Sequence, residues 1–182
     1  IDPQRDSVNG AWAVANGGLT NTEGGLVAIR VPYRPPNEYD LRVTISSVQV
    51  TPTVGVILAT QGRDLNWALF CGKAGFEMVD GRDLGGNPTC RETGGWPKSR
   101  VPGTLTIQVR RSGLKTWQDG RLVLEFATDY SNVQAHRQWN LGEKGILGLG
   151  VMGEVSFHQL EILEVSGKGT FTRPNDPAAK EA

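Results

Sequence analysis

The stretch TLTIQVRRSGLKTWQDGRLVLEFA, from Thr104 to Ala127, decides the fold of this chain. Its first part alternates the apolar residues Leu105, Ile107 and Val109 with polar residues, which predicts a β-strand with one buried and one wet face. Asp119-Gly120 supplies the two positive φ angles that a two-residue type I′ turn needs. The stretch therefore predicts antiparallel strands joined by a tight hairpin.

Short strands separated by turn residues recur along the rest of the chain, with little amphipathic helical pattern. Tyr39 to Val50 first alternates and then resumes with reversed parity, which predicts a β-bulge near Ser46-Ser47. The glycines are expected to mark turns. About a dozen strands at this spacing predict an all-β fold of two packed antiparallel sheets. The other expected strands are Val54 to Ala59, Leu65 to Cys71, Phe76 to Val79, Ile146 to Val151 and Val155 to Val165, with segments around Trp12 and at Gly25 to Val31.

Two regions lie outside this pattern. Residues 84–103 are rich in Gly, Pro and polar side chains, so we expect a loop that is either functional or mobile. Residues 167–182 hold few apolar side chains and two prolines, which is typical of a flexible C-terminal linker or tail. The predicted organisation is one sandwich domain over residues 1–166 and a linker at 167–182 that leads into a larger protein.

The charge balance argues against several classes of function. The 182 residues include 19 Lys and Arg and 19 Asp and Glu, so no strong overall field favours binding to a nucleic acid. The longest apolar stretch, Ile146 to Gly153, is far shorter than the roughly 20 residues that cross a bilayer, so we expect no membrane insertion. The chain opens without a basic and then apolar leader. Localisation stays open, and an extracellular or cell-envelope position is favoured.

The cysteines and histidines do not form a metal-binding pattern. A bridge between Cys71 and Cys90 would close a loop of about 20 residues and contribute about 3 kcal/mol, but two unpaired thiols fit the sequence equally well. These cysteines lack zinc-ligand spacing with His136 and His158. No loop rich in Asp-x-Asp appears, so the metal is unassigned, no cofactor is expected, and calcium alone is left open.

The opening, the central hairpin and the closing strands resemble the concanavalin A-like lectin and glucanase superfamily. The central hairpin is also similar to that of laminin G-like domains. The likeness covers about residues 8 to 166 and implies a two-sheet antiparallel jelly-roll β-sandwich. The matching residues are Gly10-Ala11-Trp12, Gly17-Gly18-Leu19, Val31-Pro32-Tyr33, Glu38 to Val43, Leu114 to Arg121, Ile146 to Gly150, Val155-Ser156-Phe157 and Leu160-Glu161-Ile162.

Two branches of this superfamily bear on function. One is the bacterial domain called 3-keto-disaccharide hydrolase, and the other comprises carbohydrate-binding and adhesive modules without catalysis. Phe76 to Gly81, with Asn87-Pro88-Thr89 after it, resembles domains embedded in large bacterial multidomain proteins. The resemblance therefore implies either hydrolysis or recognition of a glycan.

The carboxylates do not match the hydrolytic pattern. The laminarinase-like branch uses E-x-D-x-x-E on one strand, because retaining hydrolysis needs two carboxyl groups about 5 to 5.5 Å apart. Glu77 and Asp80 are three residues apart, as are Glu161 and Glu164, so on a regular strand each pair faces opposite sides. A G-x-S-x-G elbow, a phosphate loop and a dinucleotide fingerprint are also missing from the sequence. We therefore assign no catalytic residue.

Sugar binding needs aromatic faces to stack on the sugar ring and polar side chains to hydrogen-bond its hydroxyls. Trp12 and Trp117 occupy packing positions of the superfamily, which leaves three other tryptophans for a ligand. His158 is expected to cap a sheet or face solvent. The residues predicted to bind the ligand are Arg63, Asp64, Asn66, Trp67, Glu77, Asp80, Asn87, Trp96, Tyr130, His136 and Trp139.

The sequence thus predicts a non-catalytic, lectin-like carbohydrate-binding module of a larger bacterial protein, monomeric as an isolated domain. One alternative is a glycoside hydrolase or lyase of the 3-keto-disaccharide hydrolase type, which a deep acidic pocket with two facing carboxyl groups would favour. A second alternative is a protein-interaction or spacer domain, which an apolar or covered sheet face would favour. A protein partner is left open beside the glycan.

Overall fold

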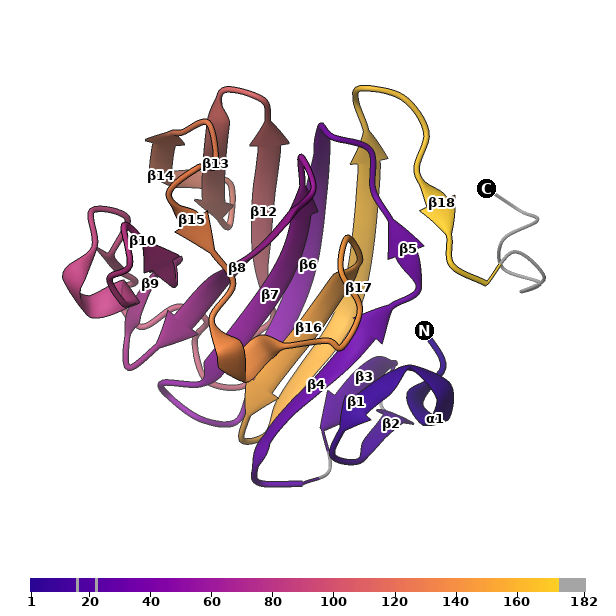
Figure 1. The fold of residues 1–182 in the computed structure, drawn as a ribbon. Helices are drawn as coiled ribbons and strands as arrows, with labels where there is room; N and C mark the ends of the chain where they lie inside the picture. The colour runs from indigo at the N-terminus through magenta and orange to yellow at the C-terminus, as the bar shows by residue number, and fades with distance from the viewer. Residues whose placement is uncertain (16, 22, 174–182) are drawn as a thin grey trace.

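The computed structural model describes residues 1–15, 17–21 and 23–173. In these residues two seven-stranded antiparallel sheets pack face to face as a jelly-roll sandwich, which confirms the predicted fold class (Figure 1). We name the sheets A and B. In spatial order, sheet A consists of β1 (Ser7–Asn9), β4 (Leu26–Val31), β16 (Leu147–Met152), β7 (Thr53–Thr60), β8 (Arg63–Phe70), β9 (Lys73–Phe76) and β11 (Arg91–Glu92).

Sheet B contains the hairpin predicted between Thr104 and Ala127. Gln118 pairs with Arg121, and Asp119 and Gly120 have φ angles of 49° and 79°, as a type I′ turn requires. The hairpin prediction is therefore confirmed. In spatial order, sheet B consists of β14 (Arg121–Ala127), β13 (Gly113–Gln118), β12 (Gly103–Arg110), β6 (Tyr39–Ser47), β17 (Val155–Glu164), β3 (Gly18–Asn21) and β2 (Trp12–Ala15).

Short elements complete the described part of the chain. Because β18 pairs with β5, the folded chain continues past the boundary expected at residue 166. The remainder of the expected linker, residues 174–182, lies outside the described residues. The short elements are the strand pairs β10 (Met78–Val79) with β15 (Val133–Gln134) and β5 (Tyr33–Arg34) with β18 (Thr170–Phe171), and the helices α1 (Pro3–Asp6), η1 (Leu84–Gly86) and η2 (Arg137–Trp139).

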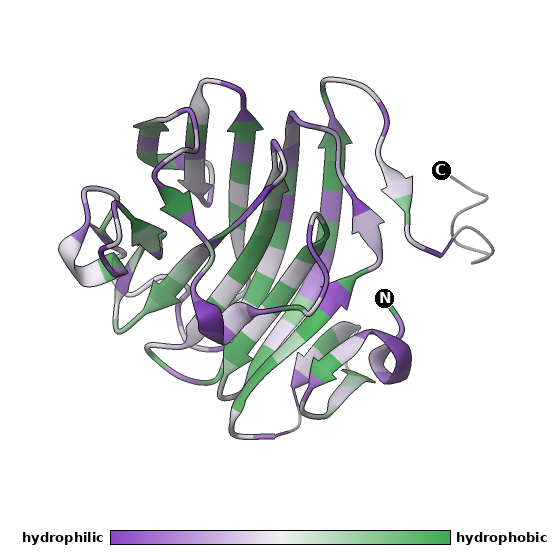
Figure 2. Ribbon diagram, viewed as in Figure 1, coloured by the Kyte–Doolittle hydropathy of each residue, from purple (hydrophilic) through white to green (hydrophobic). Residues whose placement is uncertain are grey.

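The main core lies between the two sheets and is built from the inward side of each strand. Leu105, Ile107 and Val109 of β12 are fully buried, while the residues between them are half-buried. Figure 2 shows the same alternation of apolar and polar residues along the strands of sheet B. Trp12 packs on Phe157 with ring centroids 6.3 Å apart, which confirms its packing assignment.

The predicted bulge near Ser46-Ser47 is wrong. β6 alternates without interruption to Ser47, and the pairing of β6 with β17 shifts instead between Phe157 and Gln159. The apparent change of parity arises because β6 ends at Ser47, so that Val48 and Val50 lie in exposed bends beyond the strand.

The region at 84–103 is folded onto the sandwich by the pairing of β11 with β9 and by one buried tryptophan. Trp96 is buried, packs edge-on against Trp67 with centroids 6.3 Å apart, and donates from Nε1 to an oxygen of Asp119 at 3.0 Å. Cys71, directly after β8, and Cys90, inside this region, are both free thiols, so the disulfide alternative is wrong. Among the described residues no helix is long and apolar enough to cross a bilayer.

Candidate functional site

One long connection covers the outer face of sheet A. We call residues 128–146, between β14 and β16, the crossing segment; it includes β15 and η2 and runs across the front of β8, β7 and β16 in Figure 1. Trp139, Leu141 and Ile146 of this segment pack with Ala28 and Ile57 of the sheet and form a second, smaller apolar cluster. Sheet A therefore has apolar packing on both faces.

Three glycines of sheet A make room for this cover. A Cβ atom added to Gly55 or Gly150 would lie 2.7 or 2.2 Å from the Trp139 ring, and one added to Gly148 would lie 2.6 Å from Leu141. All three glycines lie inside strands, so the expectation that glycines mark turns is wrong here. Their function is to let a second layer approach the backbone closely.

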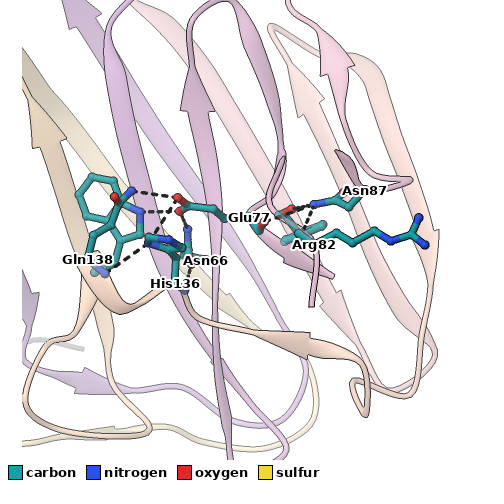
Figure 3. A network of polar contacts seen from close by, with 8 residues as sticks. Asn66, Glu77, Arg82, Asn87, His136 and Gln138 are labelled. Carbon is teal, nitrogen blue, oxygen red and sulfur yellow. Dashed lines mark hydrogen bonds and ion pairs between the residues drawn. The ribbon is translucent and has the colours of Figure 1, made fainter. Parts of the chain in front are cut away.

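A polar cluster fixes the crossing segment to the end of β9. The Glu77 carboxylate accepts hydrogen bonds from Asn66 Nδ2 at 2.5 Å, Trp139 Nε1 at 2.6 Å and Gln138 Nε2 at 2.9 Å (Figure 3). His136 Nδ1 lies 3.7 Å from the same carboxylate. These three donors satisfy both oxygens of the carboxylate, which has little exposure to water.

Asn66 connects this cluster to the backbone of the crossing segment. Its side chain is fully buried on β8, and its Oδ1 accepts from the backbone N–H of His136 at 2.8 Å. Its Nδ2 donates to Glu77, so both the oxygen and the nitrogen of the buried amide have hydrogen-bond partners. Asn66 is therefore a buried bridge between sheet A and the crossing segment.

A pocket of about 260 Å³ opens beside this cluster, between sheet A and the crossing segment. Its volume is just below the roughly 300 to 1,000 Å³ of common small-molecule pockets, so it suits a single small ring. Buried apolar side chains meet half-buried and exposed polar side chains in its wall. The lining residues are Ile57, Asp64, Ala135, His136, Arg137, Trp139, Asn140, Leu141, Glu143 and Lys144.

The structure brings together about half of the residues predicted to bind a ligand. Asn66, Glu77, His136 and Trp139 form the polar cluster, and Asp64 lines the adjoining pocket. Arg63 is adjacent to Asp64 at the start of β8, so the two side chains face opposite sides of the strand. The side chain of Arg63 is exposed and does not line the pocket.

Three aromatic side chains that were predicted to contact the ligand are buried instead. Trp67 and Tyr130 are buried in the main core, and Trp96 is buried over Gly103, so their ring faces serve packing. The Tyr130 hydroxyl donates to the carbonyl oxygens of Arg110 and Gly113, and burial raises the pKa of Tyr130 to about 12.

Asn87 and Asp80 are held by contacts that lie away from the pocket. Asn87 Nδ2 donates to the carbonyl oxygens of Phe76, Glu77 and Arg82, which braces the turn after β9. Asp80 accepts from Asn132 Nδ2 at 2.9 Å. Figure 3 shows Asn87 on the side of Glu77 away from His136, and the Arg82 side chain extending outward.

Several pocket residues were missed at the sequence level. Arg137, Asn140 and Lys144 line the pocket but are not among the residues predicted to bind the ligand, because the sequence around them has the composition of an ordinary polar loop. The available signal was the pair of glycines in Gly148-Leu149-Gly150, because glycines at alternate strand positions mark a close approach of another layer.

The two histidines and the carboxylates do not gather into a metal-ligand cluster in the described ranges. No group of three or more His, Cys, Asp or Glu side chains comes together there in an arrangement that could hold a metal ion. His158 lies on the outer face of sheet B, half-buried, with its Nε2 2.7 Å from the Ser46 hydroxyl.

A larger groove of about 1,010 Å³ lies at the other end of the sandwich. Tyr33, Phe157, Leu160 and Phe171 are among the apolar side chains that line it. At its rim the Tyr33 hydroxyl donates to Glu164 Oε1 at 2.5 Å, and burial raises the pKa of Tyr33. The groove is separate from the polar cluster and shares no lining residue with the smaller pocket.

Comparison with solved structures identifies the fold. The carbohydrate-binding module CBM66 from Bacillus subtilis superposes with a TM-score of 0.61 and 13% identity, over 87% of this chain and 94% of that one. A Crh5 transglycosylase in complex with NAG superposes with a TM-score of 0.58 and 11% identity, over 89% of this chain and 78% of that one. No protein-family model and no curated sequence matches the chain. At these identities the likeness shows the fold alone, which is the concanavalin A-like jelly roll.

Proposed function

We propose that this chain is a non-catalytic carbohydrate-recognition module that holds one sugar residue in the pocket beneath the crossing segment. The pocket itself is the observation that carries the proposal. Ile57, Trp139 and Leu141 give it an apolar wall, while Asp64, His136 and Asn140 offer hydrogen-bonding groups. A sugar ring has apolar C–H faces and a polar edge of hydroxyls, so this combination of walls matches its chemistry.

The engagement of Glu77 supports binding without catalysis. A glycosidase needs one carboxyl group free to protonate the leaving oxygen and a second one about 5 to 9.5 Å away. Both oxygens of Glu77 already accept hydrogen bonds from side chains, and the two carboxylates that line the pocket are engaged as well, Glu143 by Arg34 and Asp64 by the backbone N–H of Gly145. This carboxylate acts as a structural acceptor for the crossing segment.

The names of the structural neighbours agree with this proposal. CBM66 is named as a carbohydrate-binding module, and the Crh5 neighbour is a transglycosylase with bound NAG. Both branches act on saccharides, so the neighbours favour a glycan as the ligand while leaving the choice between binding and catalysis to the site itself.

The test is a glycan array probed with the purified domain, followed by calorimetry on each hit. Ala135 lines the pocket and the neighbouring Gln134 does not, so Ala135→Phe should fill the pocket while Gln134→Phe adds the same ring outside it. We expect saturable binding by the parent and by Gln134→Phe, and at least a tenfold loss in Ala135→Phe, which is a change of about 1.4 kcal/mol.

Two results would overturn the proposal. Equal binding by the two phenylalanine variants would place the glycan elsewhere on the molecule. Release of a cleaved sugar product, lost in Glu77→Gln without unfolding, would instead establish the hydrolase alternative.

A protein-interaction function is the second candidate, and the apolar groove of about 1,010 Å³ favours it. Val14 and Leu163, which line this groove, are strongly exposed. Exposed apolar side chains gathered around one hollow are typical of contact surfaces. Binding of a protein partner that Leu163→Glu abolishes and Ala135→Phe leaves unchanged would favour this candidate over glycan recognition.

A further inference from the structure

The charges around the pocket beneath the crossing segment are unevenly compensated. Arg137 and Lys144 line the pocket and are exposed, and neither side chain has an ion-pair partner in residues 1–15, 17–21 and 23–173. The two acidic residues of the lining are engaged: Glu143 pairs with Arg34 at 2.5 Å, and Asp64 Oδ1 accepts from the backbone N–H of Gly145 at 2.9 Å.

Two further arginines hold residues 141–144 of the crossing segment from the side of sheet A. Arg30 donates from Nε to the carbonyl oxygen of Leu141 at 2.9 Å, and Arg34 donates from a terminal nitrogen to that of Lys144 at 2.6 Å. The charged side chains that line the pocket are two basic and two acidic, and counting the adjacent Arg30, Arg34 and Glu77 leaves an excess of one positive charge, although the whole chain has a formal net charge of zero. The excess is a local property of the pocket rim.

We infer that the pocket is selective for an acidic saccharide, a sugar residue that carries a carboxylate or a sulfate group. This inference rests on the proposed function, because it specifies the ligand of the same pocket. The guanidinium group of Arg137 offers parallel donors that match either anion, and the Lys144 ammonium adds a point charge. The apolar wall contributed by Ile57 and Leu141 would meet the carbon face of the same sugar.

The test compares uronate-containing and sulfated oligosaccharides with neutral oligosaccharides of equal length, by calorimetry at about 50 mM and about 500 mM salt. At low salt we expect the acidic ligands to bind about tenfold more tightly than the neutral ones, since charge-assisted hydrogen bonds are the stronger ones. The advantage should shrink at high salt because the rim charges are exposed and screened.

Three variants locate the effect. Arg137→Gln and Lys144→Gln should each lower the affinity for acidic ligands about fivefold or more and leave the affinity for neutral ones unchanged. Arg82→Gln removes an exposed positive charge that extends away from the site in Figure 3, and should change neither affinity. Comparison of uronate with sulfate ligands tells which anion is preferred.

The outcomes separate this inference from the proposed function. Neutral ligands that bind as tightly as acidic ones, with affinities unchanged in Arg137→Gln and Lys144→Gln, would overturn the charge selectivity and leave the glycan pocket standing. Absence of binding to every saccharide at high protein concentration would overturn both.

Discussion

The outer face of sheet A is covered by another segment of the chain, whereas that of sheet B carries half-buried polar residues. In sheet A every residue of β7 is buried, because the crossing segment packs against the face that does not meet sheet B. In sheet B the residues of β12 alternate between buried and half-buried, since that outer face carries polar groups such as the ion pair between Arg110 and Asp40 at 2.6 Å. The crossing segment thus forms a third layer on the outer face of sheet A, whereas the outward residues of β12 in sheet B stay half-buried.

This difference shows where a binding pocket can form on a flat sheet. The outer face of sheet B has exposed ion pairs, which include Arg42 with Glu161 at 3.4 Å and Lys115 with Glu125 at 2.8 Å. This face does not line the smaller pocket, and it reaches the larger groove only through His158 and its neighbours in β17. On sheet A the cover itself creates a concave wall. The pocket therefore exists because the chain crosses its own sheet.

Removing one tryptophan from the outer face of each sheet tests this difference most directly. Trp139→Ala deletes the ring that packs on Gly55 and Gly150, and we expect the free energy of unfolding to fall by about 3 to 5 kcal/mol. Trp117 is half-buried on sheet B, so Trp117→Ala should cost less than about 2 kcal/mol. Urea unfolding of the two variants measures both values. Equal losses would mean that the crossing segment contributes no more than a surface side chain.

Gly55, Gly148 and Gly150, which we call the glycine seat, can be tested without removing a large side chain. Gly150→Ala places a methyl group against the Trp139 ring, and the overpacking should destabilise the protein by about 1 to 3 kcal/mol. Gly85→Ala is the matched control, because a Cβ atom there meets no neighbour. Its free energy of unfolding should stay within about 0.5 kcal/mol of the parent. A harmless Gly150→Ala would show that the Trp139 ring can move away from the sheet.

The smallest expected effect is a dependence on pH at the end of β17, where sheet B meets the β5–β18 pair. The hydrogen bond from Tyr33, followed by that from the Gly169 backbone and the contact with Lys168, lowers the pKa of Glu164 from 4.5 to about 2. Because the folded-state pKa is lowered, the stabilisation is complete above pH 4.5 and is lost as the pH falls toward 2.

Thermal unfolding between pH 2 and pH 6 checks this dependence. Glu164→Gln should give a shallower loss of stability below pH 4.5 than the parent. Glu161→Gln, which changes an exposed carboxylate of the same strand, should keep the parent's slope. Identical slopes in all three proteins would assign the acid sensitivity to other carboxylates.

The sheet that faces water was the easier one to predict. Leu105, Ile107 and Val109 alternate with polar residues because one side of β12 is wet, so both the strand and its buried face could be read from the sequence. The run Val54 to Ala59 also predicted a strand, but a continuous apolar run does not say which segment covers its second face. Here the cover comes from residues about 80 positions later in the chain.

The candidate site was predicted in part for the same reason. Asn66 and Trp67 are neighbours on β8, and alternation requires them to face opposite sides, yet only the fold decides which side is the main core. Asn66 lies on the outer side and joins the Glu77 cluster, whereas Trp67 lies inside. The basic residues Arg137 and Lys144 gave no local pattern, because their relation to the sheet depends on how the crossing segment is laid down.

The glycine seat also sets an order for folding. Trp139 packs on a strand that precedes it by about 80 residues and on β16, which follows it and pairs between β4 and β7. The seat is therefore complete only after β16 has been added to sheet A. During synthesis the tryptophan emerges before half of its binding surface exists, so its burial reports a late step of folding, when the last strands of the sandwich close.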